Sequence, residues 1–182
     1  MDLFFICGPP ASGKSTVASA LAELLGFRVV ANHATGDLAS CLFEFLTPEH
    51  RAFNAELRLF TLQRAIDSGL SGVIYTHAYS HPRSFDSVRL LLAAAAERGV
   101  KSHCVHLQCS EAELERRVLN ESRLRVSGRK IYNVDLLRRR MAEENYTTPI
   151  PGIDVLLLSS ELGAPEVVAR DIAMHYGYLQ KG

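Results

Sequence analysis

Five short apolar runs punctuate the chain, and segments with apolar residues at helical spacing separate them. Short runs without polar breaks are typical of strands that are buried on both faces of a sheet. The five predicted strands are Leu3–Cys7, Phe27–Ala31, Val73–Thr76, Lys101–Cys109 and Ile153–Ser159. The predicted helices are Lys14–Leu25, Thr35–Leu46, Pro48–Ser68, Pro82–Arg98, a helix from Ser110 to about Arg125, another from Asn133 to about Asn145, and Pro165–Tyr176.

The order of these elements predicts the class of fold. Strands that alternate with helices form a parallel sheet with helices on both faces, an α/β fold. No internal repeat or second-domain boundary interrupts the pattern. We therefore predict a single domain over residues 1–182, with an arginine-rich lid insert at about 122–132.

Charge, hydrophobicity and cysteine content indicate which binding partners and which cellular compartment to expect. The chain has 182 residues, 20 of them basic and 20 acidic, so bulk electrostatics give no reason to expect a nucleic acid or a membrane as partner. The longest apolar run, Leu90–Ala96, is far shorter than the roughly 20 residues that span a bilayer. None of the four cysteines belongs to a CxxC pair, which favours a reducing, cytoplasmic compartment.

A phosphate-binding motif follows the first predicted strand and opens the first predicted helix. Residues 8–15 read GPPASGKS and match GxxxxGK[ST] in full, in the strand–loop–helix context that the motif requires. In such loops, backbone N–H groups surround the phosphates, while the lysine reaches the β- and γ-phosphates and the hydroxyl binds Mg²⁺. The motif predicts ATP and Mg²⁺ as cofactors, with Lys14 catalytic and Ser15 the metal ligand. The expected nucleotide-binding residues are Gly8, Pro9, Pro10, Ala11, Ser12, Gly13, Lys14, Ser15 and Thr16.

Arginine is concentrated after the fourth predicted strand. Of the 16 arginines, 8 lie between Arg116 and Arg140. Arginine is preferred over lysine where a planar fork must grip a phosphate group. Arg116 and Arg123 are seven residues apart, so within one helix they would share a face, separated by about 10 Å along its axis.

The helical pattern breaks close to Ser127-Gly128, inside the arginine-rich segment. Together with the preceding arginines, Arg125 and Arg129 could clamp the adenine and the transferring phosphate when a flap at 122–132 closes and excludes water. The alternative is a solvated helix with ion pairs such as Glu113 with Arg117.

The chain resembles the small P-loop kinases of the nucleoside-monophosphate-kinase superfamily, most closely shikimate-kinase-like and gluconate-kinase-like proteins. The resemblance rests on the short chain, on GPPASGKST near the start, on LERRVLNESR after the fourth strand and on SSELGAPEVVARDI after the fifth. It implies the sheet order 2-3-1-4-5 and transfer of a phosphoryl group from ATP to a hydroxyl group. It also implies that Arg116 acts on ATP, that Arg123 acts from the flap, and that Ser159–Ala164 packs on adenine.

The acceptor side differs from that of shikimate kinases. Where those enzymes have an acidic DxD-type motif after the second strand, residues 31–37 read ANHATGD, with one displaced acid. Where they have three consecutive glycines after the third strand, residues 76–79 read THAY. The flap also lacks their Arg-Pro-Leu-Leu sequence. The identity of the acceptor therefore stays open.

Polar residues follow the second and third predicted strands. Because ligands bind at the carboxyl ends of parallel strands, we expect Asn32 and His77 to contribute to an acceptor pocket near the γ-phosphate. Thr76 and Tyr79 are further candidates at the same edge. On the helix between these strands, Arg58 could hold an anionic group of the acceptor, on one polar face with Arg51 and Asn54. Its alternative is a solvated helix face.

Two residues are candidates for the group that orients the acceptor hydroxyl. Asp37 is the first, because it is the only carboxylate soon after the second strand and kinases often use an aspartate in this role. Its alternative is a cap for a helix entered at Leu38. His33 is the second candidate, since a histidine at a strand end can take up a proton near neutral pH.

These residues predict an ATP-dependent small-molecule kinase, with two alternative functions. The first is a kinase that acts on a nucleotide or on a nucleic-acid end, which an extended basic groove would favour. The second is a nucleotide-binding switch or weak ATPase without a small acceptor. The lack of an acid after the third strand supports this second alternative, because Mg²⁺ is often held from that position.

Overall fold

The computed structural model describes residues 1–120, 131, 133–161 and 163–180. Five strands form one sheet, and every neighbouring pair is parallel. The strand order is β2-β3-β1-β4-β5, which confirms the predicted order. The strands are β1 (Asp2–Cys7), β2 (Arg28–Val30), β3 (Gly72–His77), β4 (Lys101–Gln108) and β5 (Val155–Ser159).

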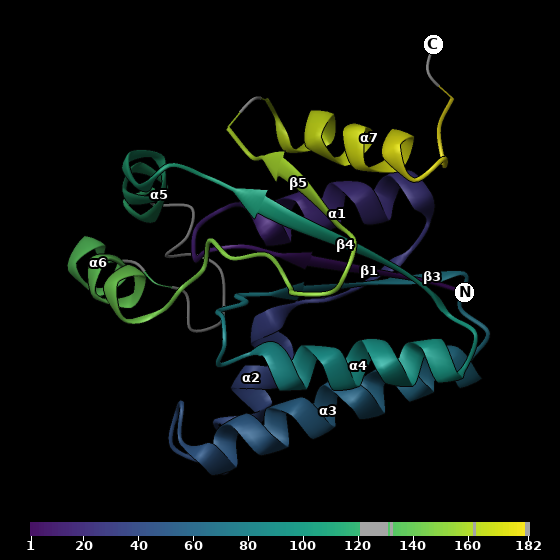
Figure 1. The fold of residues 1–182 in the computed structure, drawn as a ribbon, viewed down its shortest axis with the longest axis horizontal. Coiled ribbons are helices and arrows are strands. Elements are labelled where there is room, and N and C mark those ends of the chain that lie inside the picture. Colours follow the sequence, from purple (N-terminus) through teal and green to yellow (C-terminus); the bar gives the residue numbers. More distant parts are fainter. Residues whose placement is uncertain (121–130, 132, 162, 181–182) are drawn as a thin grey trace.

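Helices cover both faces of this sheet, and the predicted α/β class is confirmed (Figure 1). On one face lie α1 (Lys14–Leu25) and α7 (Pro165–His175). On the other lie α3 (Pro48–Asp67) and α4 (Phe85–Glu97), with α2 (Asn32–Ala39) against α3. The last two helices, α5 (Glu111–Val118) and α6 (Val134–Glu143), lie beyond the carboxyl ends of the strands.

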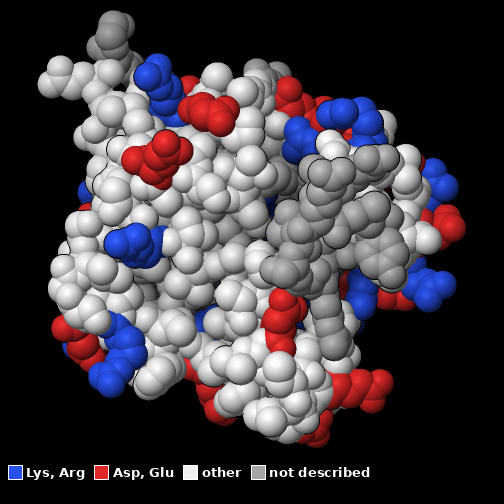
Figure 2. Space-filling model, turned by 180° about the vertical axis from the view of Figure 1, so that it is seen from behind, with Lys and Arg blue, Asp and Glu red and all other residues white. Residues whose placement is uncertain are grey.

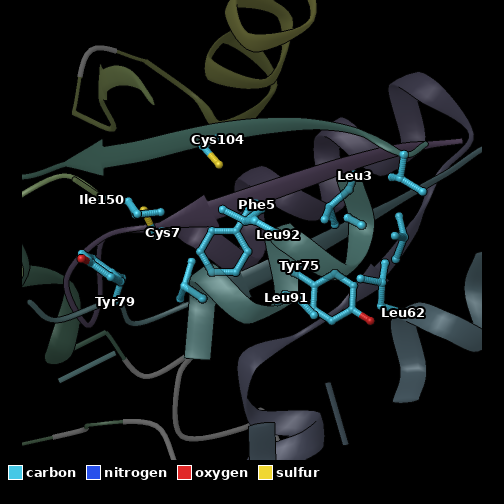
Figure 3. Packing of buried hydrophobic residues seen from close by; sticks show 14 residues of the cluster. Leu3, Phe5, Cys7, Leu62, Tyr75, Tyr79, Leu91, Leu92, Cys104 and Ile150 are labelled. Carbon is cyan, nitrogen blue, oxygen red and sulfur yellow. The ribbon is translucent and has the colours of Figure 1, made fainter. Parts of the chain in front are cut away.

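Polar and apolar residues do not alternate along Leu3–Cys7 of the central strand, β1, because helices cover both of its faces. Leu3 and Phe5 project toward α3 and α4, where Tyr75 and Leu91 pack around them (Figure 3). The residue between them, Phe4, packs on the opposite face against α1 and α7. Each fully buried large apolar side chain contributes about 1.5–3 kcal/mol, so a polar residue would be unfavourable anywhere from Leu3 to Cys7, while the partly exposed Asp2 at the start of the strand contacts His103.

Side-chain caps fix the starts of the two helices near the arginine-rich segment. The Ser110 hydroxyl accepts the N–H of Glu113 at 3.4 Å, as the sequence predicts for the start of α5. The side-chain oxygen of Asn133 accepts the N–H groups of Asp135 and Leu136 at 2.7 and 3.1 Å. Both caps confirm predicted helix starts.

Four predicted helix boundaries are wrong. Helix α2 begins at Asn32 rather than Thr35 and ends at Ala39 rather than Leu46. Its early start follows from a long-range contact, because the N–H of Asn32 donates to the Thr76 hydroxyl of β3 at 2.9 Å. Helix α4 begins at Phe85, since a turn takes up residues 82–84.

The predicted helix from Ser110 to about Arg125 also ends early, at Val118. Most of the predicted lid at 122–132 lies outside the described residues, as do Arg123, Arg125 and Arg129. No helix in the described part of the chain is both long and apolar enough to cross a membrane.

Candidate active site

The phosphate-binding motif forms a tight loop between β1 and α1. Gly8 has φ +143°, and a Cβ there would lie 2.5 Å from the carbonyl oxygen of Leu107. A side chain at this position would therefore force β4 to shift. Gly13 has φ +86° and caps α1, and its carbonyl accepts the N–H groups of Thr16 and Val17 at 3.0 Å each. The helix thus begins inside the motif, in the arrangement by which helix starts bind anions.

Lys14 is held within the curve of this loop. Its ammonium donates to the carbonyls of Gly8 and Pro9 at 3.0 and 2.5 Å, and the hydroxyl of Ser12 lies 3.4 Å away. Lys14 is only 9% exposed. A cation that is largely screened from water acts more strongly on a bound anion than a solvated one.

One arginine of α5 lies against the loop. The guanidinium of Arg117 donates to the hydroxyl and carbonyl oxygens of Ser160 at 3.0 and 2.7 Å, and to Glu113 at 2.7 Å. A Cβ on Gly13 would lie 3.4 Å from the same guanidinium. Arg117 therefore connects the phosphate loop to the segment before α7, which the resemblance assigns to adenine packing.

The predicted arginine, Arg116, lies elsewhere. Its side chain is 71% exposed and makes two 2.6 Å hydrogen bonds to Glu113. These bonds and those from Arg117 lower the pKa of Glu113 to about 2. At Arg116 the structure therefore agrees with the alternative of a solvated helix with ion pairs. Arg117, rather than Arg116, is the arginine that lies against the phosphate loop. Helical spacing could have shown this, because Arg117 is three residues after the buried Leu114 and shares its face.

Asn32 connects three elements at the other side of the loop. Its N–H bonds to the end of β3, as described above, and its side-chain oxygen accepts Nη2 of Arg58 at 2.5 Å and lies 3.1 Å from Nδ1 of His77. Arg58 is 7% exposed and also lies 3.4 Å from the carbonyl of Thr76. Burial lowers its pKa to about 10. The predicted substrate-binding residues Asn32, Arg58 and His77 therefore form one connected group.

These contacts fix the proton on His77. Because arginine can only donate, the Asn32 atom that accepts from Arg58 is its oxygen, and Nδ1 of His77 must donate to that oxygen. Burial lowers the pKa of His77 well below 6.5, and the positive charges of Arg58 and Lys14 lower it further. The ring is therefore neutral. Its Nε2 is an acceptor with no hydrogen-bond partner among the described residues.

Both candidates for the hydroxyl-orienting group lie on α2. His33 and Asp37 are four residues apart and line the same cavity. Asp37 lies inside the helix rather than at its start, so the alternative interpretation of Asp37 as a cap is wrong. Whether either residue handles the acceptor proton stays a prediction.

A single cavity of about 750 Å³ joins the phosphate loop to the acceptor side. It reaches Lys14, Ser15 and Thr16 in the loop, and the groups that follow β2 and β3. Arg51, Asn54 and Arg58 all line it, so the predicted polar face of α3 is confirmed. A smaller cavity of about 290 Å³ between α5 and α6 includes no residue of the loop.

Several cavity residues were missed by sequence reasoning. They come from the α2–α3 and β3–α4 connections, from α3, α4 and α6, and from the segment after α6. They include Phe45, His50, Ser80, Arg83, Ser84, Asp86, Ser87, Arg140, Glu144 and Tyr146. None belongs to a local motif, and the sequence pattern at Pro82 predicted the start of a helix rather than a cavity-lining turn.

The residues present fit a magnesium ion only in part. Ser15 lies directly after Lys14 at the start of α1 and lines the cavity, so its hydroxyl could bind Mg²⁺. The described residues include no cluster of three His, Cys, Asp or Glu side chains able to hold a metal ion. If Mg²⁺ binds here with ATP, phosphate oxygens and water would supply the other ligands.

Comparison with known proteins identifies the family to which this sequence belongs. The sequence matches the AAA domain family over residues 3–127, a span that includes the phosphate loop and α5. A search of curated proteins gave no match.

Solved structures of kinases share the fold. A sugar kinase from Janibacter sp. HTCC2649 is 17% identical, with TM-score 0.67 over 96% of this chain and 93% of that chain. A gluconokinase from Sinorhizobium meliloti 1021 is 14% identical, with TM-score 0.64 over 99% and 97%. Shikimate kinase from Acinetobacter baumannii, in complex with shikimate, is 18% identical, with TM-score 0.56 over 100% and 96%. The resemblance to small P-loop kinases is thus confirmed for the fold.

Proposed function

The chain belongs to the AAA domain family, and we propose that it transfers the γ-phosphoryl group of ATP to a hydroxyl group of a small molecule. One observation carries the proposal. The phosphate loop and the polar groups after β2 and β3 line a single cavity, about 750 Å³ in volume, which is large enough for a small acceptor beside the triphosphate. The fold that this chain shares with sugar, gluconate and shikimate kinases supports it.

The phosphate loop would hold the triphosphate in this reaction. Its backbone N–H groups and Lys14 stabilise the charge that develops on the γ-phosphoryl oxygens, and Ser15 would help to hold Mg²⁺. When bound with ATP, Mg²⁺ neutralises part of the phosphate charge. Arg117 takes the place that the resemblance gave to Arg116, because it fixes the segment at Ser160 against Gly13.

The acceptor would lie between the loop and α2. Its hydroxyl oxygen attacks the γ-phosphorus, the bond from that phosphorus to the bridging oxygen of ADP breaks, and the hydroxyl proton passes to Asp37 or His33. Asn32, Arg58 and His77 would position the acceptor, and Arg123 would act from the flap.

Two observations bear on the two alternative functions, a switch or weak ATPase and a kinase for nucleic-acid ends. A switch or weak ATPase needs no acceptor space, whereas this cavity extends from the loop to α4 and α6. A kinase for nucleic-acid ends needs an extended basic groove, and on the face shown in Figure 2 acidic and basic side chains are interspersed among the described residues. The extent of the cavity favours a small acceptor.

Acceptor-dependent turnover is the direct test. ADP release would be measured with ATP and Mg²⁺ alone and with pooled sugars, sugar acids, polyols and hydroxy acids, both free and as their monophosphates, followed by mass spectrometry of any newly phosphorylated product. We expect stimulation by one pool in the wild-type protein and none in Lys14→Ala. Equal ADP release with and without every pool would favour the switch or ATPase alternative instead.

A further inference from the structure

Three arginines from separate parts of the chain line the cavity wall outside the phosphate loop. Arg51 comes from α3, Arg83 from the connection between β3 and α4, and Arg140 from the last turn of α6. We refer to these three residues as the arginine wall. The mechanism proposed above assigns no role to any of them.

The members of the arginine wall lie within electrostatic range of one another. The pKa of Arg51 is lowered first by burial and then by the positive charges of Arg83 and Arg140, while Glu144 and Tyr146 raise it. The same groups act on the Tyr146 hydroxyl, whose pKa burial raises to about 12. All three arginines line the same cavity as Glu144 and Tyr146 and lie near enough to act on them.

Only part of the wall is neutralised by its surroundings. Arg83 forms an ion pair with Glu144, whose side chain is 7% exposed. Nε of Arg51 donates to the neutral carbonyl of Leu46 at 2.9 Å, and its guanidinium forms no ion pair with a carboxylate among the described residues. The guanidinium of Arg140 forms no hydrogen bond or ion pair with any residue in the described part of the chain, although its backbone carbonyl accepts the N–H of Glu144. Three guanidinium groups thus face one carboxylate.

The balance of charge indicates what this wall would bind. Arginine does not lose its proton in proteins, so the wall keeps two positive charges that no carboxylate in the group offsets. A phosphate monoester carries about −1.5 to −2 charges at pH 7 and presents three acceptor oxygens. The planar forks of arginine bind such a group through paired hydrogen bonds, whereas a carboxylate would supply only one charge.

We propose that the arginine wall binds a phosphate monoester group of the acceptor, so that the substrate is a hydroxyl compound that already carries one phosphate. This inference rests on the proposed function, because it places that phosphate in the same cavity as the reacting hydroxyl. It is a site separate from the phosphate loop and from Arg58, which is already bonded to Asn32. Reactions that act before this one would have to supply a phosphorylated precursor.

The test uses the intact chain with its phosphate loop occupied. The protein would be saturated with Mg²⁺ and a non-hydrolysable ATP analogue, so that added anions cannot bind at Lys14. Binding of methyl phosphate would then be measured by calorimetry at pH 7.5, with acetate as the singly charged probe. We expect methyl phosphate to bind at least about tenfold more tightly than acetate, since each charged hydrogen bond adds at least about that factor.

Two variants change the wall in opposite directions. Arg140→Gln should weaken methyl phosphate binding about tenfold or more, and Glu144→Gln should strengthen it because the wall gains a net positive charge. The matched control is Arg139→Gln, an exposed arginine on the same helix that does not line the cavity. It should bind as the wild type does.

The outcome separates this inference from the proposed function. Equal methyl phosphate affinity in the wild type and in both Arg140→Gln and Glu144→Gln, or acetate binding as tight as that of methyl phosphate, would overturn the arginine wall as a phosphate site. That result would leave a kinase with a different acceptor standing. Specific binding without any acceptor-dependent turnover would instead support the site and count against the kinase.

Discussion

The side-chain oxygen of Asn32 lies 3.1 Å from Nδ1 of His77, and it also accepts a hydrogen bond from the buried Arg58. Asn32 opens α2 and His77 ends β3, so this contact joins the two strand ends that sequence reasoning assigned to the acceptor. It also decides which ring nitrogen of His77 carries the proton.

The first prediction concerns the protonation of His77. Nitrogen NMR of the imidazole should show a neutral ring protonated at Nδ1 throughout the range from pH 8 to 5.5, because the pKa is well below 6.5. In Asn32→Asp, a carboxylate replaces the amide beside the ring and should raise the pKa of His77. A ring that titrates near 6.5 in the wild type would contradict the buried network.

The second prediction concerns how the lowered pKa of His77 affects the stability of the fold. The folded-state pKa of His77 is depressed, so below about pH 6.5 the unfolded chain binds more protons and the free energy of unfolding falls as the pH falls. His103 and His106, whose pKa values are also lowered by burial, contribute in the same direction. His77→Gln should reduce this slope by up to about 1.4 kcal/mol per pH unit between pH 6.5 and 5. Urea unfolding across that range measures it.

Lys14 provides the sharpest test of the phosphate loop. Lys14→Ala removes the cation held in the curve of the loop, while the backbone N–H groups remain. We expect turnover to fall by roughly two orders of magnitude or more, with a smaller loss of ATP affinity. Lys101→Ala, at the exposed start of β4, is the charge-matched control. Near-normal turnover in Lys14→Ala would show that the loop is not catalytic.

Two neighbouring arginines should differ in their effect on ATP binding. Arg117→Ala frees the segment at Ser160 from the phosphate loop, and we expect ATP affinity to fall about tenfold or more. Arg116→Ala removes an exposed ion pair and should change the affinity little. Calorimetric titration with an ATP analogue compares them directly. A larger loss in Arg116→Ala would restore the assignment made from the resemblance.

Two glycine substitutions should have opposite effects on stability. Gly8→Ala places a Cβ 2.5 Å from the carbonyl of Leu107, so the free energy of unfolding should fall by about 2 kcal/mol or more. At Gly36, inside α2, a Cβ would meet nothing within 4 Å. Gly36→Ala should therefore raise stability by about 0.5–1 kcal/mol. Thermal and urea unfolding of both variants would test the loop geometry independently of activity.

The hydroxyl-orienting group is tested by two substitutions on α2, each of which replaces a side chain that can take a proton with a neutral amide. Asp37→Asn keeps the shape of the side chain but cannot take a proton, so a catalytic Asp37 predicts a sharp loss of turnover with little change in melting temperature or ATP affinity. If His33 takes the proton, His33→Gln should flatten the pH–rate profile between about pH 6 and 8. Full acceptor-dependent turnover in both variants would move the search to Thr76, His77 and Tyr79.

Local sequence determined the fold and half of the candidate site. The uninterrupted apolar runs specified strands buried on both faces, since a strand covered by helices on each side has no solvent-facing position. The phosphate loop was readable because Gly8, Gly13 and Lys14 act through local backbone geometry that the motif itself encodes. The positions of Asn32 and His77 followed from the rule that parallel strands end at one edge.

Tertiary structure alone decided where α2 begins, which arginine lies against the phosphate loop and which residues form the arginine wall. These features depend on contacts between residues far apart in the sequence, which local sequence patterns do not encode. The hydrogen bond from Asn32 to Thr76 moved the start of α2 and so placed Asp37 inside a helix rather than at its cap. The selection of Arg117 over Arg116 depends on Ser160, which lies 43 positions further along the chain. The three residues of the arginine wall come from separate segments, and no repeating pattern in the sequence relates their positions. Its net positive charge is concentrated at one place only in the folded chain, where three guanidinium groups and a single buried carboxylate, Glu144, line the same cavity.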